Sequence, residues 1–210
     1  MTKFLKRIFI LVLILSILLG IVKIFDIKEK VLKNIYPTTY SEYVYKYSEE
    51  NEIDPLLIFA IIKAESNFNQ DAVSNSNAIG LMQLVESTAK EIAEKNLNMS
   101  FSKETLYNPE YNIKIGTAYY AKLLEKYNRN TGVALAAYNA GIGKVDTWIK
   151  DGIIKEDGSD LENIPYKETN NYVRKILRDY NIYKKIYVNG DGLFWHIMKY
   201  SLVEILLFYY

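Results

Sequence analysis

The chain has 210 residues, half of them apolar, which suffices for one domain with a hydrophobic core and short appendages. Its 26 basic and 25 acidic residues give a net charge of +1, so no long-range field favours nucleic acid, and we exclude that partner class. Cysteine is absent and His196 is the single histidine, which argues against disulfides, a histidine-based triad and a zinc site. We expect no metal and no other cofactor.

The first 25 residues have the pattern of a signal anchor. Lys3, Lys6 and Arg7 precede an uncharged apolar run from Ile8 to Val22, and no small-residue cleavage motif follows it. Because basic residues before such a run hold the N-terminus in the cytoplasm, we expect a single-pass protein of the cell membrane with its remaining residues outside the cytoplasm. A buried core helix is the alternative.

The composition predicts four parts along the chain. They are a membrane anchor over 1–25, a tether over 26–39 that contains Pro37, a mainly α domain over 40–187, and an apolar C-terminal tail over 188–210. The tail contains Lys199 and Glu204 within an apolar stretch, a pattern that suggests an interfacial helix or a second, poor membrane segment, and its role is unknown.

Capping patterns predict the helices of the central domain. Asp54 before Pro55 and Asn108 before Pro109 are N-caps followed by proline at the first helical position. Thr131 opens a short alanine-rich helix that Gly141 can close. Two polar stretches, residues 67–78 and 151–164, are predicted to be surface loops, where functional sites are often assembled.

Glu65 is the candidate catalytic acid. On the helix that starts at Pro55, it continues an apolar stripe formed by Ile58, Ile61 and Ile62. Such surroundings disfavour the ionised carboxyl and raise its pKa toward the value that a general acid needs at neutral pH. The alternative is a glutamate at a helix end that reaches solvent. Asp71, the other nearby carboxylate, is interpreted as a solvated surface residue.

Four blocks of sequence, in this order and spacing, resemble the lytic transglycosylases of the soluble-lytic-transglycosylase type. They are Glu65-Ser66 with Asn69 and Ser74, Gly80-Leu81-Met82-Gln83-Leu84, Ala136-Ala137-Tyr138-Asn139-Ala140-Gly141, and Ile164-Pro165-Tyr166-Lys167-Glu168-Thr169 with Tyr172-Val173. The resemblance covers about residues 40–187 and implies a lysozyme-like α fold.

The resemblance implies that peptidoglycan glycan strands are the substrate. Glu65 would protonate the bridging oxygen of a MurNAc-β-1,4-GlcNAc bond and then, as base, take the proton of the C6 hydroxyl whose oxygen closes on C1. The product would be a 1,6-anhydroMurNAc end. Two alternatives stay open: a hydrolytic muramidase of the same fold, and a non-catalytic glycan-binding or assembly protein. Family precedent also allows a partner complex in the cell envelope.

The resemblance further assigns roles to individual residues, each with a structural alternative. Tyr138 would lie beside the acid as a second catalytic residue, or be an ordinary core tyrosine. The residues implied in substrate binding are Ser74, Gln83, Met82, Glu168 and Asn139. The alternatives are a turn cap for Ser74, an exposed helical position for Gln83, a favourable place at a helix N-terminus for Glu168, and a turn-forming role for Asn139.

Three places depart from the family pattern. The position two past Gln83, often methionine or followed by proline in the family, is Val85, and Glu86 follows it. Asn77 stands where the family usually has glycine, and Asn170 stands where arginine is common.

Overall fold

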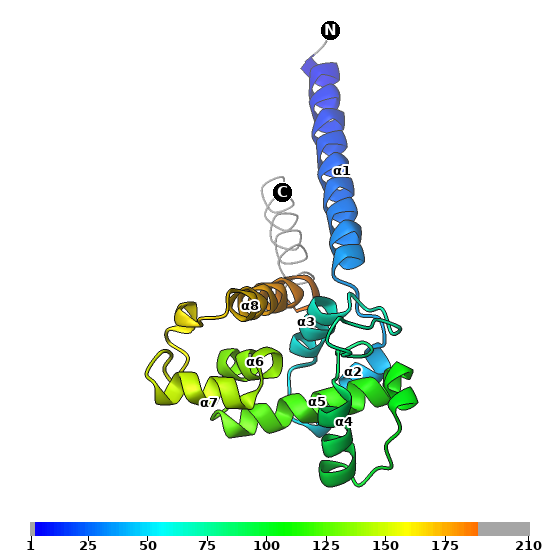
Figure 1. Cartoon of the computed structure of the whole chain (residues 1–210). Helices are drawn as coiled ribbons and strands as arrows, with labels where there is room; N and C mark the ends of the chain where they lie inside the picture. The colour runs from blue at the N-terminus through cyan, green and yellow to red at the C-terminus, as the bar shows by residue number, and fades with distance from the viewer. Residues whose placement is uncertain (1–2, 189–210) are drawn as a thin grey trace. The chain divides into compact units, whose positions relative to one another are not determined.

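The computed structural model describes residues 3–188 as helices joined by loops (Figure 1). The α-helices are α1 (Lys3–Ile35), α2 (Ser41–Glu50), α3 (Pro55–Glu65), α4 (Glu86–Glu91), α5 (Pro109–Lys126), α6 (Thr131–Ala140), α7 (Ile142–Lys150) and α8 (Lys167–Tyr187). A π-helical turn, η1 (Ile92–Asn96), and two 3₁₀ turns, η2 (Lys103–Tyr107) and η3 (Leu161–Asn163), complete the set. The predicted mainly α class is confirmed for these residues.

The chain forms two compact units that are divided after Pro37. The first consists largely of α1, whose 33 residues extend beyond the predicted anchor through most of the predicted tether. The large apolar side chains from Phe9 to Leu15 are all exposed. Within residues 3–188, no helix combines the length and the hydropathy that crossing a membrane requires. Residues 189–210, which include most of the predicted tail and His196, lie outside the described part.

Helix α3 is the centre of the second unit. Every residue from Leu56 to Ile62 is buried, so the helix is apolar all round and not only along the stripe of Ile58, Ile61 and Ile62. It packs against α2 and α8, while α6 packs against α5, α7 and α8. Figure 1 shows α8 along one edge of this unit.

Local capping explains where these helices begin. The Asp54 side chain accepts a hydrogen bond from the backbone N–H of Leu56 at 2.8 Å, and Asn108 accepts one from Tyr111 at 3.2 Å. Both caps are followed by proline at the first helical turn, as predicted. Gly141 ends α6 with a φ of 87°, a conformation that favours glycine.

The loop between α3 and α4 is held by a few backbone hydrogen bonds. Ile79 and Leu84 exchange N–H···O bonds of 3.0 Å across a tight turn, and Val73 forms a second antiparallel bridge with Ile79. This turn contains Gly80, Met82 and Gln83. The fold therefore presents one of the four motif blocks as a compact loop beside the end of α3.

Candidate active site

Glu65 is the last residue of α3, and its carboxyl group is partly buried. Burial raises its pKa from 4.5 to about 7, against smaller lowering effects from a hydrogen bond with Tyr172 and from the charge of Lys175. The C-terminal end of a helix carries partial negative charge, which also disfavours a carboxylate. Near neutral pH, Glu65 is thus poised between its acid and its base form.

Tyr172, on α8, contacts the candidate acid directly. Its hydroxyl group donates a hydrogen bond of 2.6 Å to Oε1 of Glu65, and burial raises the pKa of this phenol well above its usual value. Tyr172 fixes the position of the carboxyl group and keeps its own proton. Lys175, on the same helix, donates to the carbonyl oxygen of Ala64 at 3.4 Å.

The sequence interpretation did not assign a role to Tyr172, although it belongs to the last motif block. It lies one residue before Val173 and four before Ile176, both buried, so it faces the core side of α8. That spacing is the signal that could have identified it.

Tyr138, on α6, lies near Glu65 but is bonded elsewhere. Its hydroxyl donates to the backbone carbonyl of Met82 at 2.7 Å, and its ring centroid is 5.2 Å from that of Tyr119. Its pKa is raised well above the usual value, first by burial and then by the charge of Glu65. The structure thus brings Tyr138 into the electrostatic surroundings of the acid without a direct hydrogen bond to it.

Met82 is fully buried, so the part of it that faces the polar groups of the site is its backbone. Its carbonyl oxygen holds Tyr138, and its N–H donates to Oδ1 of Asn112 at 2.8 Å. Its side chain lies against Gly116, where an added Cβ would collide with the sulfur. A contact between substrate and the Met82 side chain would need this packing to open.

Asn112 is a buried residue whose side chain holds a loop by hydrogen bonds, and the sequence interpretation missed it. Besides accepting from Met82, its side-chain amide donates to the carbonyl oxygens of Ile79 at 3.0 Å and Leu106 at 2.8 Å. Gly80, with a φ of 80°, leaves room for this amide, because a Cβ there would overlap Asn112. One side chain thereby fixes the loop that carries the Gly80–Leu84 motif.

We expect Asn112→Ala to lower the free energy of unfolding by about 3 kcal/mol, since the N–H of Met82 and the carbonyl oxygens of Ile79 and Leu106 each lose a hydrogen bond and a cavity opens. Denaturant unfolding followed by circular dichroism measures the change. Asn108→Ala, which removes an exposed helix cap, serves as the comparison and should cost about 1 kcal/mol. Equal losses of unfolding free energy in the two variants would contradict the role of the Asn112 side chain in holding the loop.

The predicted substrate-binding residues Gln83 and Ser74 both make local hydrogen bonds. The Gln83 amide nitrogen donates to the carbonyl oxygens of Ala72 at 3.1 Å and Gly80 at 3.0 Å. Gln83 has a φ of 48° and lies in the turn, so the helical position considered for it is wrong. Ser74 Oγ accepts from the N–H groups of Ser76 and Ala78, which is a turn-capping arrangement.

Glu168 and Asn139 lie on exposed positions at the junction of α6 and α8. Glu168 is in the first turn of α8, as predicted. Asn139 Oδ1 accepts a hydrogen bond of 2.8 Å from Thr169, which links the two helices. The interpretation of Asp71 agrees with its exposed side chain.

Two of the three departures from the family pattern have a local structural explanation. Asn77 has a φ of 59°, the left-handed region that glycine and asparagine adopt most readily. The Asn170 side chain donates to the carbonyl oxygens of Leu161 at 3.0 Å and Glu162 at 2.9 Å. Both asparagines support loops.

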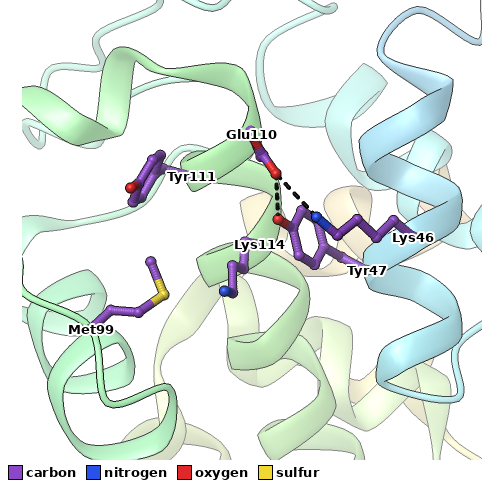
Figure 2. A pocket seen from close by; sticks show the side chains of 6 residues that line it. All are labelled: Lys46, Tyr47, Met99, Glu110, Tyr111 and Lys114. Carbon is purple, nitrogen blue, oxygen red and sulfur yellow. Dashed lines mark hydrogen bonds and ion pairs between the residues drawn. The ribbon is translucent and has the colours of Figure 1, made fainter.

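A separate pocket of about 210 Å³ lies between α2 and α5 (Figure 2). It is lined by Lys46, Tyr47, Met99, Glu110, Tyr111 and Lys114. Glu110 accepts hydrogen bonds from Tyr47 at 2.7 Å and from Lys46 at 3.2 Å. Three of the polar side chains that line the pocket are therefore hydrogen-bonded to one another. None of the predicted site residues lines it. In the described part of the chain, no group of three His, Cys, Asp or Glu residues is suited to hold a metal ion.

Comparison with known proteins gives consistent matches. The family model described as "Transglycosylase SLT domain" matches residues 42–158. The soluble lytic murein transglycosylase of Escherichia coli K12 is 33% identical over 162 residues, which are 76% of this chain and 25% of the relative. The membrane-bound lytic murein transglycosylase C of Edwardsiella ictaluri is 41% identical over 115 residues, which are 50% of this chain and 32% of the relative.

A solved structure agrees with these matches. An inactive Glu-to-Gln mutant of the lytic transglycosylase Slt from Pseudomonas aeruginosa superposes with a TM-score of 0.66 at 35% identity, over 71% of this chain and 24% of that one. The chain thus spans about a quarter of the length of the soluble relatives that it matches. Because the family model covers more than half of its residues, the chain belongs to the transglycosylase SLT domain family.

Proposed function

We propose that the protein is a peptidoglycan lytic transglycosylase that cleaves the MurNAc-β-1,4-GlcNAc bond without net addition of water and leaves 1,6-anhydroMurNAc ends. Membership of the SLT family and the similarity to lytic murein transglycosylases support this reaction. The solved relative whose Glu-to-Gln mutant is inactive supports a glutamate as the essential group.

In the proposed mechanism, Glu65 begins each turnover protonated. It donates its proton to the bridging oxygen as the C1–O bond breaks, and the GlcNAc residue leaves with a free hydroxyl. The carboxylate then accepts the proton of the muramyl C6 hydroxyl while that oxygen bonds to C1. Glu65 is protonated again at the end, so neither water nor a second acid is consumed.

The observation that carries the proposal is the isolation of the Glu65 carboxyl group. Within the described residues, the charge that influences its pKa is the ammonium of Lys175, and no carboxylate contributes. A retaining glycosidase holds two carboxyl groups about 5 to 5.5 Å apart, close enough for each to influence the other. A mechanism with one carboxyl group therefore fits this site better than the retaining two-carboxylate mechanism, and the reaction products separate it from an inverting hydrolase, whose carboxyl groups lie about 6.5 to 9.5 Å apart.

Tyr172 and Tyr138 have supporting roles in the proposal. Tyr172 orients the carboxyl group through its 2.6 Å hydrogen bond, and Tyr138 anchors the loop at Met82 beside it. Ser74, Gln83, Glu168 and Asn139 stay candidates for contacts with the sugar chain. Since the Gln83 nitrogen is bonded to backbone, a contact of Gln83 with an acetamido group would use its carbonyl oxygen.

Mass spectrometry of digested peptidoglycan tests the reaction. We expect anhydromuropeptides 18 Da lighter than the reducing-end products of a muramidase, because the elements of water are not added. Reducing ends would instead support the muramidase alternative. Absence of any cleavage in zymography, with the protein folded, would support the non-catalytic alternative.

Tyr172→Phe provides a more specific test of the site. Because the Tyr172 hydrogen bond lowers the pKa of Glu65, its loss should raise that pKa further, and the rate should fall off at a higher pH than in the wild type. Tyr180→Phe is a matched control, since the Tyr180 hydroxyl on the same helix donates to Asp54 at 2.7 Å. An unchanged pH profile in Tyr172→Phe would mean that the bond to Glu65 does not exist in the working enzyme.

We further propose that the N-terminal segment, residues 1–25, holds the protein at the membrane with its catalytic domain outside the cytoplasm. The exposed apolar side chains of α1 and the basic residues before them support this localisation, as does the membrane-bound relative. Retention in the membrane fraction after high salt, and release by detergent, is the expected result. A partner complex in the envelope stays a prediction.

A further inference from the structure

The outward face of α8 carries a row of cations and amides without a carboxylate. Six of its exposed positions recur at alternate spacings of four and three residues, which places them on one line along the helix. They are Lys167, Asn171, Arg174, Arg178, Asn181 and Lys185, and we call this row the α8 basic face. At 1.5 Å per residue, the row is about 27 Å long.

The charge of the chain is separated between α8 and the rest of the catalytic domain. Helix α8 contains six basic residues and two acidic ones, Glu168 and Asp179, whereas residues 38–166 contain twelve basic and nineteen acidic residues. A net charge of +4 on one helix thus lies beside −7 on the preceding part of the domain. Asp179 is buried and pairs with Arg178 at 3.0 Å, which offsets one cation of the row, and Glu168 is exposed beside Lys167 at the start of the helix.

We propose that the α8 basic face docks on the anionic headgroups of a lipid bilayer. The inference rests on the membrane localisation proposed above and adds a second contact to it. Charge complementarity supports it, because each Lys or Arg near an anionic surface adds to the affinity. The sequence supports it as well, since residues 193–210, shortly after α8 in the chain, are rich in apolar and aromatic residues, a composition that favours a membrane interface.

The geometry of α8 makes this docking compatible with catalysis. Tyr172, which holds Glu65, is on the side of the helix that faces the core, together with the buried Val173 and Ile176. A bilayer against the opposite face would therefore not cover the Glu65 contact. Because α8 lies along an edge of the domain, its outward face can meet a flat surface (Figure 1).

The absence of cysteine allows a direct test on the full chain. A fluorophore attached through Asn181→Cys reports on the α8 basic face, and one attached through Ser87→Cys on α4 is the reference. The labelled proteins are reconstituted in vesicles of phosphatidylcholine alone or with roughly one-third phosphatidylglycerol, with a quencher on the headgroups. We expect quenching at position 181 in the anionic vesicles alone, reversed by about 0.5 M NaCl, and none at position 87.

Charge variants make the test quantitative. Arg174→Gln with Lys185→Gln should lower the ratio of docked to undocked protein about thirtyfold, since each basic residue contributes roughly fivefold. Lys90→Gln with Lys150→Gln, two exposed lysines outside α8, removes the same charge and should leave the ratio unchanged. Equal effects of the two pairs would overturn the docking site, because net charge alone would then explain the attraction.

Two further outcomes separate this inference from the proposed function. Equal quenching at position 181 in neutral and anionic vesicles would overturn the docking, and cleavage of peptidoglycan by the same preparation would show that the proposed activity stands without it. Protection of position 181 by soluble poly(glycerol phosphate), but not by anionic vesicles, would assign the face to an anionic wall polymer and likewise overturn the lipid proposal.

Discussion

Glu65→Gln is expected to lower the rate of peptidoglycan cleavage about a thousandfold or more. General acid and general base catalysis each contribute about 10²–10⁴, and in the proposed mechanism one carboxyl group supplies both. The amide keeps the shape of the side chain and can still accept the hydrogen bond from Tyr172, but it cannot transfer a proton. Release of soluble muropeptides over time measures the loss.

The stability of the same variant shows whether lost activity means a lost fold. The pKa of Glu65 is raised from 4.5 to about 7, so its neutral form is favoured in the fold, and stability is lost as the pH rises from about 4.5 to about 7 and stays lost above that. Since each unit of pKa corresponds to about 1.4 kcal/mol, Glu65→Gln should be more stable than the wild type by up to about 3 kcal/mol at pH 9. Below pH 4.5 this advantage should disappear.

Asp71→Asn and Glu168→Gln are the matched controls. Both remove a carboxyl group from an exposed position, and neither group influences the pKa of Glu65. Asp71→Asn should leave the rate unchanged, and Glu168→Gln should at most raise the KM if Glu168 binds substrate. More than a few per cent of activity in Glu65→Gln would assign the acid to another residue.

The sequence predicted well those features that depend on neighbouring residues. The starts of α3 and α5 are each set by one capping side chain, which accepts a hydrogen bond from the backbone N–H two or three residues later. The end of α6 is set by one glycine. The prediction of Glu65 as the acid depended on the four motif blocks, because the apolar helix alone fitted a glutamate that reaches solvent equally well. The continuation of α1 to Ile35 was missed, since the polar residues after the apolar run resemble those of a flexible tether.

Contacts between distant segments could not be predicted in this way. The hydrogen bond between Glu65 and Tyr172 joins residues 107 positions apart, and its existence depends on the packing of α8 against α3. Asn112 looks like one more polar residue in the first turns of α5, yet it is fully buried and holds the loop of Met82. The sequence motif identified Gln83, but its conformation in the turn depends on backbone hydrogen bonds that the motif does not contain.

The dependence of the rate on pH should reveal the same carboxyl group in the wild-type enzyme. Turnover requires Glu65 to be protonated at its start, and burial raises its pKa to about 7 despite the lowering effects of Tyr172 and Lys175. The rate should therefore be constant below about pH 6, fall tenfold per unit above pH 7, and be about a hundredfold lower at pH 9. Lys175→Gln removes a charge that lowers this pKa, so it should move the fall to higher pH, whereas Lys150→Gln should not. A rate that stays flat from pH 5 to pH 9 in the full-length enzyme would contradict a mechanism in which one carboxyl group serves first as acid and then as base.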